Sequence, residues 1–513
     1  MKFYKKALAL VLSTMLLGSV MVGCGTSTSN AAQGEDAIIK MAQSTDVISF
    51  DPHNHNDVSS ANVTRHVFSN LVKLTTDGEF VGDLAESWEF LDDLNVKFTL
   101  KPDVKFHNGD VLTAEDVKFS LERQKNSSKV GHLVKMIDSV EVVDDLNVII
   151  HMNEPSSALI SSLAHSGGAI LNKKVVEELD ATGKTMDSNM IGTGPYKFES
   201  WNPGDSVSLV RNDEYFGEKP ANGGLQLRVI TEESSRTIAL ETGEIDVVLD
   251  VASTDANRIR DNSELDLVEY ESTQVEFLVM NTQKAPFDNE LVRKAINHAV
   301  DKESIITVAV NGEATPQTSY LGDGAIGYSS DVTAYDYDLE KAKALLAEAG
   351  YANGFECTVY VASDIRSRAA QVLQASLAQI GVTLRIEQMD SGVFYDKTGT
   401  GEHDMALTGW VANAEPDNTF RPLFHSSNIG SGGNRSFYVN PTVDGLIDEA
   451  AITQEMDERL ENYAEVLRIV TDDAIFAPFY TKKGLVAKRD NVDGIEVYPI
   501  NMHRFENIHF VQE

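Results

Sequence analysis

The sequence predicts an α/β protein built from two or three domains. The chain has 513 residues, too many for one compact core, since domains usually hold ~100–200 residues. Helical and strand-like hydrophobic periodicities alternate along much of the chain, which is typical of α/β domains. Hydrophobic residues make up 42% and charged residues 24% of the chain, as in ordinary soluble globular proteins, so a buried core can form.

The first 36 residues are predicted to be a targeting segment and a tether. Three lysines precede an apolar run over residues 7–22, which is shorter than the ~20 apolar residues of a permanent membrane helix. This pattern predicts a signal peptide over residues 1–23. The run ends at Cys24 in a motif that resembles a bacterial lipobox, in which the cysteine thiol is acylated; an ordinary secretory signal with a chance cysteine is the alternative. Residues 24–36 are small and polar, as in a flexible tether.

The region 81–122 is predicted to consist of strands and turns. Residues 95–100 alternate between apolar and polar side chains, and Asn108-Gly109 is a turn signal. Farther along, four segments carry apolar residues at helical spacing, and two apolar segments indicate strands. The helices are expected after Asp288, after Asp338, over 368–380 and over 458–470, and the strands over 382–386 and 475–480.

The charge balance excludes one class of partner. The chain carries 43 Lys and Arg against 79 Asp and Glu, and the acidic residues are spread along its length. A field of this sign repels a phosphate backbone, so we expect no nucleic-acid partner.

The sequence offers no motif of a familiar enzyme class. Gly322–Gly327 matches the spacing of a dinucleotide-binding loop, but no apolar strand precedes it and no helix follows, so it is predicted to be a plain loop. The segment 430–435 could cradle an anion, yet it does not have the ending of a phosphate-binding loop and is interpreted as a connector. Nucleophile and zinc-protease motifs are absent. We therefore predict that the protein is not an enzyme, with a glycosidase carboxylate pair left open.

The loop Asp51–Asp57 packs two histidines and two aspartates into seven residues and could bind a transition metal. No other Cys or His pair with ligand spacing supports such a site. We predict a locally hydrogen-bonded turn and no metal or other cofactor.

A series of short blocks resembles family 5 of the bacterial extracellular solute-binding proteins, whose members bind dipeptides, oligopeptides, glutathione and nickel for ABC importers. The resemblance covers nearly all of the chain after the signal peptide. Its main blocks are Leu84–Trp88, Lys97–Leu100, Val104–Gly109, Leu112–Val117, Ser120–Arg123, Gly192–Tyr196, Val292–Ile296, Ala342–Leu346 and Gly409-Trp410. The stretch around Asn56-Asp57, with Arg421–Phe424, is most similar to the glutathione-binding branch.

The resemblance implies a two-lobed, type II periplasmic-binding-protein-like fold with an extra third region. Lobe one would hold residues 37–272, including an extra region at about 75–190, and would be completed by residues 482–513. Lobe two would hold residues 273–481. The ligand would bind in the cleft between the lobes, which would close on it by hinge motion.

The implied function is that of an extracytoplasmic substrate-binding lipoprotein. It would capture peptides or peptide-like solutes and deliver them to the permease and ATPase subunits of an ABC importer. The protein would be a monomer, anchored through lipid on Cys24 to the outer face of the cell membrane, or in the periplasm of a host with an outer membrane. A carrier of a nickel chelate or haem is the alternative, and a secreted hydrolase is a third hypothesis.

The resemblance also implies residues that touch the ligand. In dipeptide-binding relatives, an aspartate three residues after the Gly-Trp pair binds the α-amine of the peptide, and here that position is Asn413. Either the ligand has no free α-amine at this point, or the nearby Glu415 or Asp417 binds the amine instead.

Four more residues complete the predicted site. Arg366 is the expected partner of the ligand carboxylate, and Trp410 is expected to pack on the ligand backbone. An indole in the core of a lobe is the alternative for Trp410. Asn56 and Asp57 are included because they lie in the stretch most similar to the glutathione-binding branch.

Overall fold

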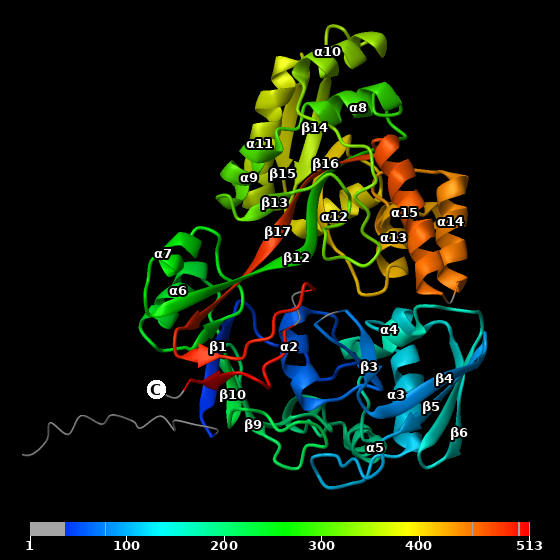
Figure 1. The fold of residues 1–513 in the computed structure, drawn as a ribbon, viewed down its shortest axis with the longest axis vertical. Helices are drawn as coiled ribbons and strands as arrows, with labels where there is room; N and C mark the ends of the chain where they lie inside the picture. Colours follow the sequence, from blue (N-terminus) through cyan, green and yellow to red (C-terminus); the bar gives the residue numbers. More distant parts are fainter. Residues whose placement is uncertain (1–35, 77, 454, 501–502, 512–513) are drawn as a thin grey trace, which may run out of the picture.

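The computed structural model describes residues 36–511, apart from residues 77, 454 and 501–502. The predicted signal peptide, Cys24 and the tether up to residue 35 lie outside the described residues. The chain forms an upper and a lower half joined by two long strands, β12 and β17 (Figure 1). Among the described residues, no helix is both long enough and apolar enough to cross a membrane.

One mixed sheet runs through both halves, as expected of an α/β protein. Within the described residues it holds 11 strands, and parallel pairs such as β1 with β10 occur beside antiparallel ones. From the upper to the lower end the order is β15 (Thr383–Gln388), β14 (Glu356–Val361), β16 (Met405–Val411), β12 (Leu265–Met280), β17 (Phe476–Arg489), β11 (Val247–Val248), β1 (Ile38–Gln43), β10 (Gly224–Val229), β9 (Ser206–Arg211) and β8 (Tyr196–Asn202), with β13 (Ala314–Pro316) paired to β17.

The strands β12 and β17 change neighbours along their length. Their antiparallel register shifts between Glu271 and Val275, and only residues from Gln274 onward pair with β16 of the upper half. The five clusters of buried apolar residues do not cross this point. Two draw on residues 275–480. The other three draw on residues 39–265 and 485–508. Each half therefore has its own core.

The lower half contains a four-stranded antiparallel sheet that packs on helix α3 (Ala114–Lys125). The prediction of strands and turns over 81–122 is therefore wrong from Ala114 onward, because Thr113 and Asp116 form a capping box that starts a helix there. The strands of this sheet are β4 (Ala85–Asp92), β5 (Asn95–Leu100), β7 (Asn147–Met152) and β6 (Ile137–Asp144). The predicted alternation over 95–100 is confirmed, because β5 buries every second residue. Asn108-Gly109 forms the predicted turn, with Gly109 at φ 88°. The other α-helices and strands are α2 (Val58–Val67), β2 (Val72–Leu74), β3 (Phe80–Gly82), α4 (Leu159–Ala164), α5 (Lys173–Thr182), α6 (Glu233–Glu241), α7 (Ala256–Arg260), β18 (Val492–Asp493) and β19 (His509–Phe510).

The upper half contains the four helices predicted from the sequence. They are α8 (Glu290–His298), α10 (Leu339–Glu348), α11 (Asp364–Gln379) and α15 (Met456–Asp472). Asp338 caps α10 as expected, accepting from the backbone N of Lys341 at 2.9 Å. α11 begins four residues earlier than predicted, because the Ser363 side chain caps it. The remaining helices are α9 (Lys302–Val310), α12 (Ser391–Gly399), α13 (Asp417–Phe424) and α14 (Pro441–Ile452).

Candidate ligand-binding cleft

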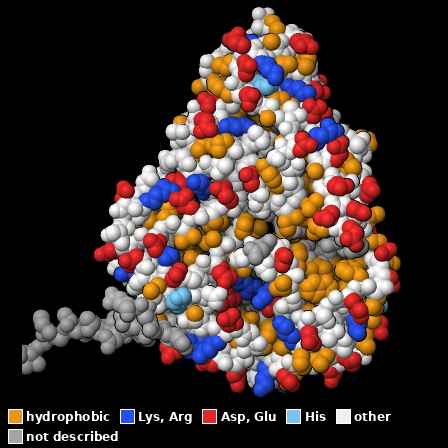
Figure 2. All heavy atoms as spheres, in the orientation of Figure 1, with side chains coloured by type: hydrophobic (Ala, Val, Ile, Leu, Met, Phe, Trp, Pro, Cys, Tyr) orange, Lys and Arg blue, Asp and Glu red, His pale blue; other side chains and the backbone are white. Residues whose placement is uncertain are grey.

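A cavity of about 500 Å³ lies between the two halves. The space-filling view shows a hollow at this level, with Lys and Arg side chains gathered just below it (Figure 2). The lower half lines the cavity with residues of α2, β2, β3 and α4, with His132 and with the C-terminal residues Tyr498, Ile500 and Arg504. The upper half contributes residues 410–415, which are the end of β16 and the loop after it, together with Asn418 and Pro422.

Four of the predicted site residues lie in the walls of this cavity: Trp410, Asn413, Glu415 and Asn56. The side-chain amide of Asn413 donates to the backbone O of Asn418 at 3.3 Å, and its backbone N donates to Thr419 Oγ1 at 2.9 Å. The Asn413 Oδ1 atom is therefore left to accept a hydrogen bond. Trp410 is half-buried, and its Nε1 has no hydrogen-bond partner among the described residues.

Glu415 also lines the cavity, but its charge is already compensated. The side chain is buried and forms an ion pair with Arg459 of α15. Burial raises the pKa of Glu415, and the Arg459 guanidinium opposes that shift. Arg459 further donates from Nε to the backbone O of Ala450 at 3.1 Å. Glu415 thus helps to stabilise the upper half through its ion pair with Arg459.

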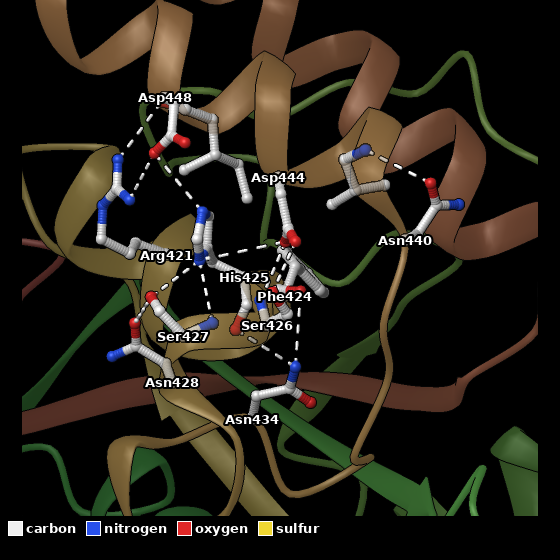
Figure 3. A network of polar contacts seen from close by, with 12 residues as sticks. Arg421, Phe424, His425, Ser426, Ser427, Asn428, Asn434, Asn440, Asp444 and Asp448 are labelled. Carbon is white, nitrogen blue, oxygen red and sulfur yellow. Dashed lines mark hydrogen bonds and ion pairs between the residues drawn. The ribbon is translucent and has the colours of Figure 1, made fainter.

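Asp417 does not line the cavity. Both of its carboxylate oxygens accept from Arg421 Nε, at 3.1 and 3.0 Å, across one turn of α13. Arg421 also donates to Asp448 of α14 at 2.8 Å, and Asp448 lies 3.3 Å from His425 Nε2 (Figure 3). Asp417 therefore belongs to a polar network that joins α13 to α14.

The same network contains Ser427, His425 and Asp448, the residue types of a hydrolase triad (Figure 3). His425 Nδ1 accepts from Ser427 Oγ at 2.7 Å and from the backbone N of Ser427 at 3.0 Å. The imidazole thereby caps the short 3-10 turn Ser426–Asn428. A ring nitrogen that accepts a hydrogen bond from a backbone N–H stabilises the local fold and does not act as a base toward Ser427. This geometry therefore gives the hydrolase hypothesis no support.

Arg366 lies outside the residues that line the cavity. Its guanidinium donates to both carboxylate oxygens of Glu276 on β12, at 2.9 and 3.1 Å. Gln274 Nε2 donates to the same carboxylate at 2.9 Å. The cation predicted to meet the ligand is thus compensated inside the upper half.

Asp57 does not line the same cavity as Asn56, its neighbour in the chain. It caps α2, accepting from the backbone N of Ser60 at 2.8 Å. It lines a second cavity, of about 460 Å³, beside the joining strands. Gln43 and Asn62 also line this second cavity and are buried, and Gln274 and Lys482 contribute from the strands.

The loop Asp51–Asp57 is held together by hydrogen bonds and ion pairs. The two oxygens of Asp51 accept from Arg123 of α3 at 2.9 and 2.5 Å. His55 Nε2 lies 3.2 Å from Thr64 Oγ1. Burial lowers the pKa of the neighbouring His53 to about 4. Within the part of the chain that the structure describes, no group of three or more His, Cys, Asp or Glu side chains could hold a metal ion.

The cavity contains charged residues that the sequence analysis did not single out. Arg65, Lys73 and Arg504 line its lower side, with one carboxylate, Asp83. Arg504 pairs with Glu506 at 3.1 Å. Burial lowers the pKa of Arg65 to about 9, so its guanidinium is charged at neutral pH. In the sequence, Arg65 sits in the last turn of α2, where a basic residue is ordinary because it complements the helix dipole.

Three comparisons place the chain among known proteins. The family model described as bacterial extracellular solute-binding proteins, family 5 Middle, matches residues 79–431. The chain is 32% identical over 488 residues to a glutathione-binding protein of Pectobacterium atrosepticum, covering 92% of this chain and 94% of the relative. It is 30% identical over 478 residues to heme-binding protein A of Haemophilus influenzae, covering 87% of each.

A solved structure supports the fold. The periplasmic binding protein DppA of Helicobacter pylori, in complex with the peptide STSA, matches with a TM-score of 0.79 and 30% identity. The match covers 93% of this chain and 99% of that one.

Proposed function

The chain belongs to family 5 of the bacterial extracellular solute-binding proteins, and on that basis we propose that its interlobe cavity captures a peptide-like solute that carries carboxylates. The protein is the extracytoplasmic substrate-binding component of an ABC importer. Its task is recognition, followed by delivery of the solute to a membrane permease.

The charge of the cavity walls carries the ligand proposal. Arg65 and Lys73 have no ion-pair partner among the described residues, while the upper-wall carboxylate, Glu415, is paired with Arg459. Opposite these cations, Asn413 presents an uncharged amide. An anionic ligand would be attracted to such walls, and an ammonium facing Asn413 alone would be poorly compensated. The glutathione-binding relative is consistent with this class, since glutathione carries two carboxylates.

A carrier of haem is the second candidate. One relative is named a heme-binding protein, and His132 lines the cavity with its side chain exposed, so that it offers an imidazole to a metal. Thermal unfolding with glutathione, peptide pools, nickel–histidine and haem distinguishes the two. A ligand at 100 times its Kd stabilises a protein by ~2.7 kcal/mol. We expect glutathione or peptides to raise the Tm; a shift with haem or the nickel chelate alone would favour the alternative.

The two halves are proposed to act as closing lobes. Residues 37–272 and 482–513 would move against residues 273–481 about the joining strands. The separate cores and the register shift between Glu271 and Val275 support this division.

The lipid anchor is also a proposal. Cys24 ends an apolar segment and precedes a small, polar stretch that would tether the described residues to the membrane. Acylation at this thiol would hold the binding protein close to its permease.

A further inference from the structure

We propose that Arg65 of α2 is the residue that receives a ligand carboxylate, in the role for which the family resemblance implied Arg366. This inference rests on the proposed function, since it takes the 500 Å³ cavity as the ligand site.

Arg366 already has an anionic partner. Its guanidinium already makes two hydrogen bonds to Glu276, and the pair is mostly buried, with side-chain exposures of 18% and 10%. An arginine with a buried carboxylate partner has little to gain from a second anion. It also lies outside the walls of the cavity.

Arg65 is in the opposite situation. Its Nε donates to the backbone O of Ala61 at 3.0 Å, which leaves both terminal nitrogens of the guanidinium available. Among the described residues no carboxylate lies within 4.0 Å of it. Two nearby carboxylates are engaged elsewhere: Glu506 pairs with Arg504, and Asp83 of the same cavity accepts from the backbone N of Asn70.

The surroundings of Arg65 favour a ligand oxygen. Arg65 is half-buried in the cavity wall, and a partly desolvated cation without a counter-ion is costly unless a ligand supplies the anion. Two further donors in the same walls have no partner among the described residues, Ser162 Oγ and Trp410 Nε1. Buried polar groups are normally hydrogen-bonded. Donors without a partner around one cavity therefore indicate that a polar ligand accepts their hydrogen bonds.

The chemistry of the side chain sets the ligand class. A guanidinium offers two parallel N–H groups that match the two oxygens of a carboxylate, and this fork gives geometric selectivity as well as attraction. Because Nε is held by the helix carbonyl, the terminal nitrogens form the accessible edge. The site would therefore select the carboxylate end of a peptide-like solute.

Calorimetric titration tests the proposal with reduced glutathione, its diethyl ester and a pool of dipeptides. For the wild type we expect the ester to bind about ten-fold or more weakly than glutathione, because a charged hydrogen bond is lost. Arg65→Gln should weaken glutathione binding by a similar factor and leave the ester little changed. Arg65→Lys keeps the charge but not the fork, so it should fall between the two.

Two matched controls separate a specific contact from a general field. Lys73→Gln removes one positive charge from the same cavity, so it should weaken glutathione binding only through the field of the walls, by less than about three-fold and by less than Arg65→Gln does. The double variant Glu276→Gln, Arg366→Gln removes Arg366 together with its partner Glu276, so that no unpaired charge is left behind. This variant should have little effect on the affinity for glutathione.

Three outcomes would overturn the inference. If the wild type bound glutathione and its ester with equal affinity, no residue of the protein would recognise a carboxylate. Equal affinities of wild type and Arg65→Gln, or equal losses in Arg65→Gln and Lys73→Gln, would remove the special role of Arg65 while leaving the proposed function in place. A wild type that binds neither glutathione nor any dipeptide would overturn the proposed function, and the role of Arg65 with it.

Discussion

At the scale of single residues, we expect Asn413 to decide which end of a peptide the upper wall can accept. An aspartate here would bring a negative charge into the cavity and lose the bond to the backbone O of Asn418. Asn413→Asp should therefore weaken an anionic ligand and improve dipeptides that carry a free α-amine. A charge-assisted bond contributes ~1.5–3 kcal/mol, so changes of about ten-fold or more are expected in calorimetric titration. Unchanged affinity for both ligand types would show that Asn413 does not meet the ligand.

Asp417 provides the complementary prediction. Because Arg421 holds its carboxylate and it lies outside the cavity walls, Asp417→Asn should alter ligand affinity by less than about three-fold. The fold should become slightly less stable, since a partly buried ion pair with Arg421 is broken. Loss of ligand binding in this variant, with an unchanged melting curve, would make Asp417 the amine-binding residue after all.

Cys24 is tested by fractionation. The wild-type protein should sediment with membranes, whereas Cys24→Ala should be released as soluble protein, because the acyl chains are lost. Equal membrane retention of both would contradict the lipoprotein proposal.

The site could be predicted from the sequence only in part. The family resemblance pointed to Trp410, Asn413, Glu415 and Asn56, and all four lie in the cavity walls. The compensation of Arg366 could not be foreseen, since its partner Glu276 lies 90 residues away in the chain. Arg65 gives no signal either, because a basic residue in the last turn of a helix is common.

At the scale of elements, the helices α8, α10, α11 and α15 followed from apolar periodicity and from punctuation at their ends. Asp338 caps α10, and Gly381, at φ 84°, follows α11. The long joining strands were harder to predict. β17 extends over 14 residues across both halves, whereas its apolar pattern marked only 475–480. The remaining length is fixed by pairing with β12, a contact distant in the sequence.

One contact between elements is expected to control closure. The backbone O of Ala451, near the end of α14, accepts from Ser157 N at 3.1 Å and from Ser157 Oγ at 3.0 Å. Carbonyls in the last turn of a helix lack partners within it, so Ser157 of the lower half satisfies one in the upper half. Ser157→Ala removes one of these bonds, worth ~0.5–1.5 kcal/mol.

We expect this variant to release ligand about two- to ten-fold faster in stopped-flow measurements, because the closed form is less favoured. Ser156→Ala is the matched control, since that hydroxyl accepts only from the backbone N of Ala158 within its own half. Equal dissociation rates in the wild type and Ser157→Ala would mean that this contact does not limit opening.

At the scale of the whole molecule, several buried histidines make stability depend on pH. Burial lowers to about 4 the pKa values of His53, His66, His107, His165, His403 and His503. Between pH ~6.5 and ~4 the unfolded chain binds more protons than the folded one, so stability rises with pH across this window. Each proton difference contributes about 1.4 kcal/mol per pH unit. The urea midpoint should fall steadily from pH 6.5 to 4; a constant midpoint would contradict the buried, neutral state of these rings.

We propose that the cavity between the two halves carries a peptide-like, carboxylate-bearing solute. The most direct measurement is the identity of the molecule that the protein holds when it is purified. The full chain would be purified from its own host, with mild detergent present throughout, and then denatured. The small molecules that it releases would be identified by mass spectrometry. We predict a stoichiometric peptide, glutathione or a related compound with at least one free carboxylate. A stoichiometric haem or nickel chelate in its place would contradict the account.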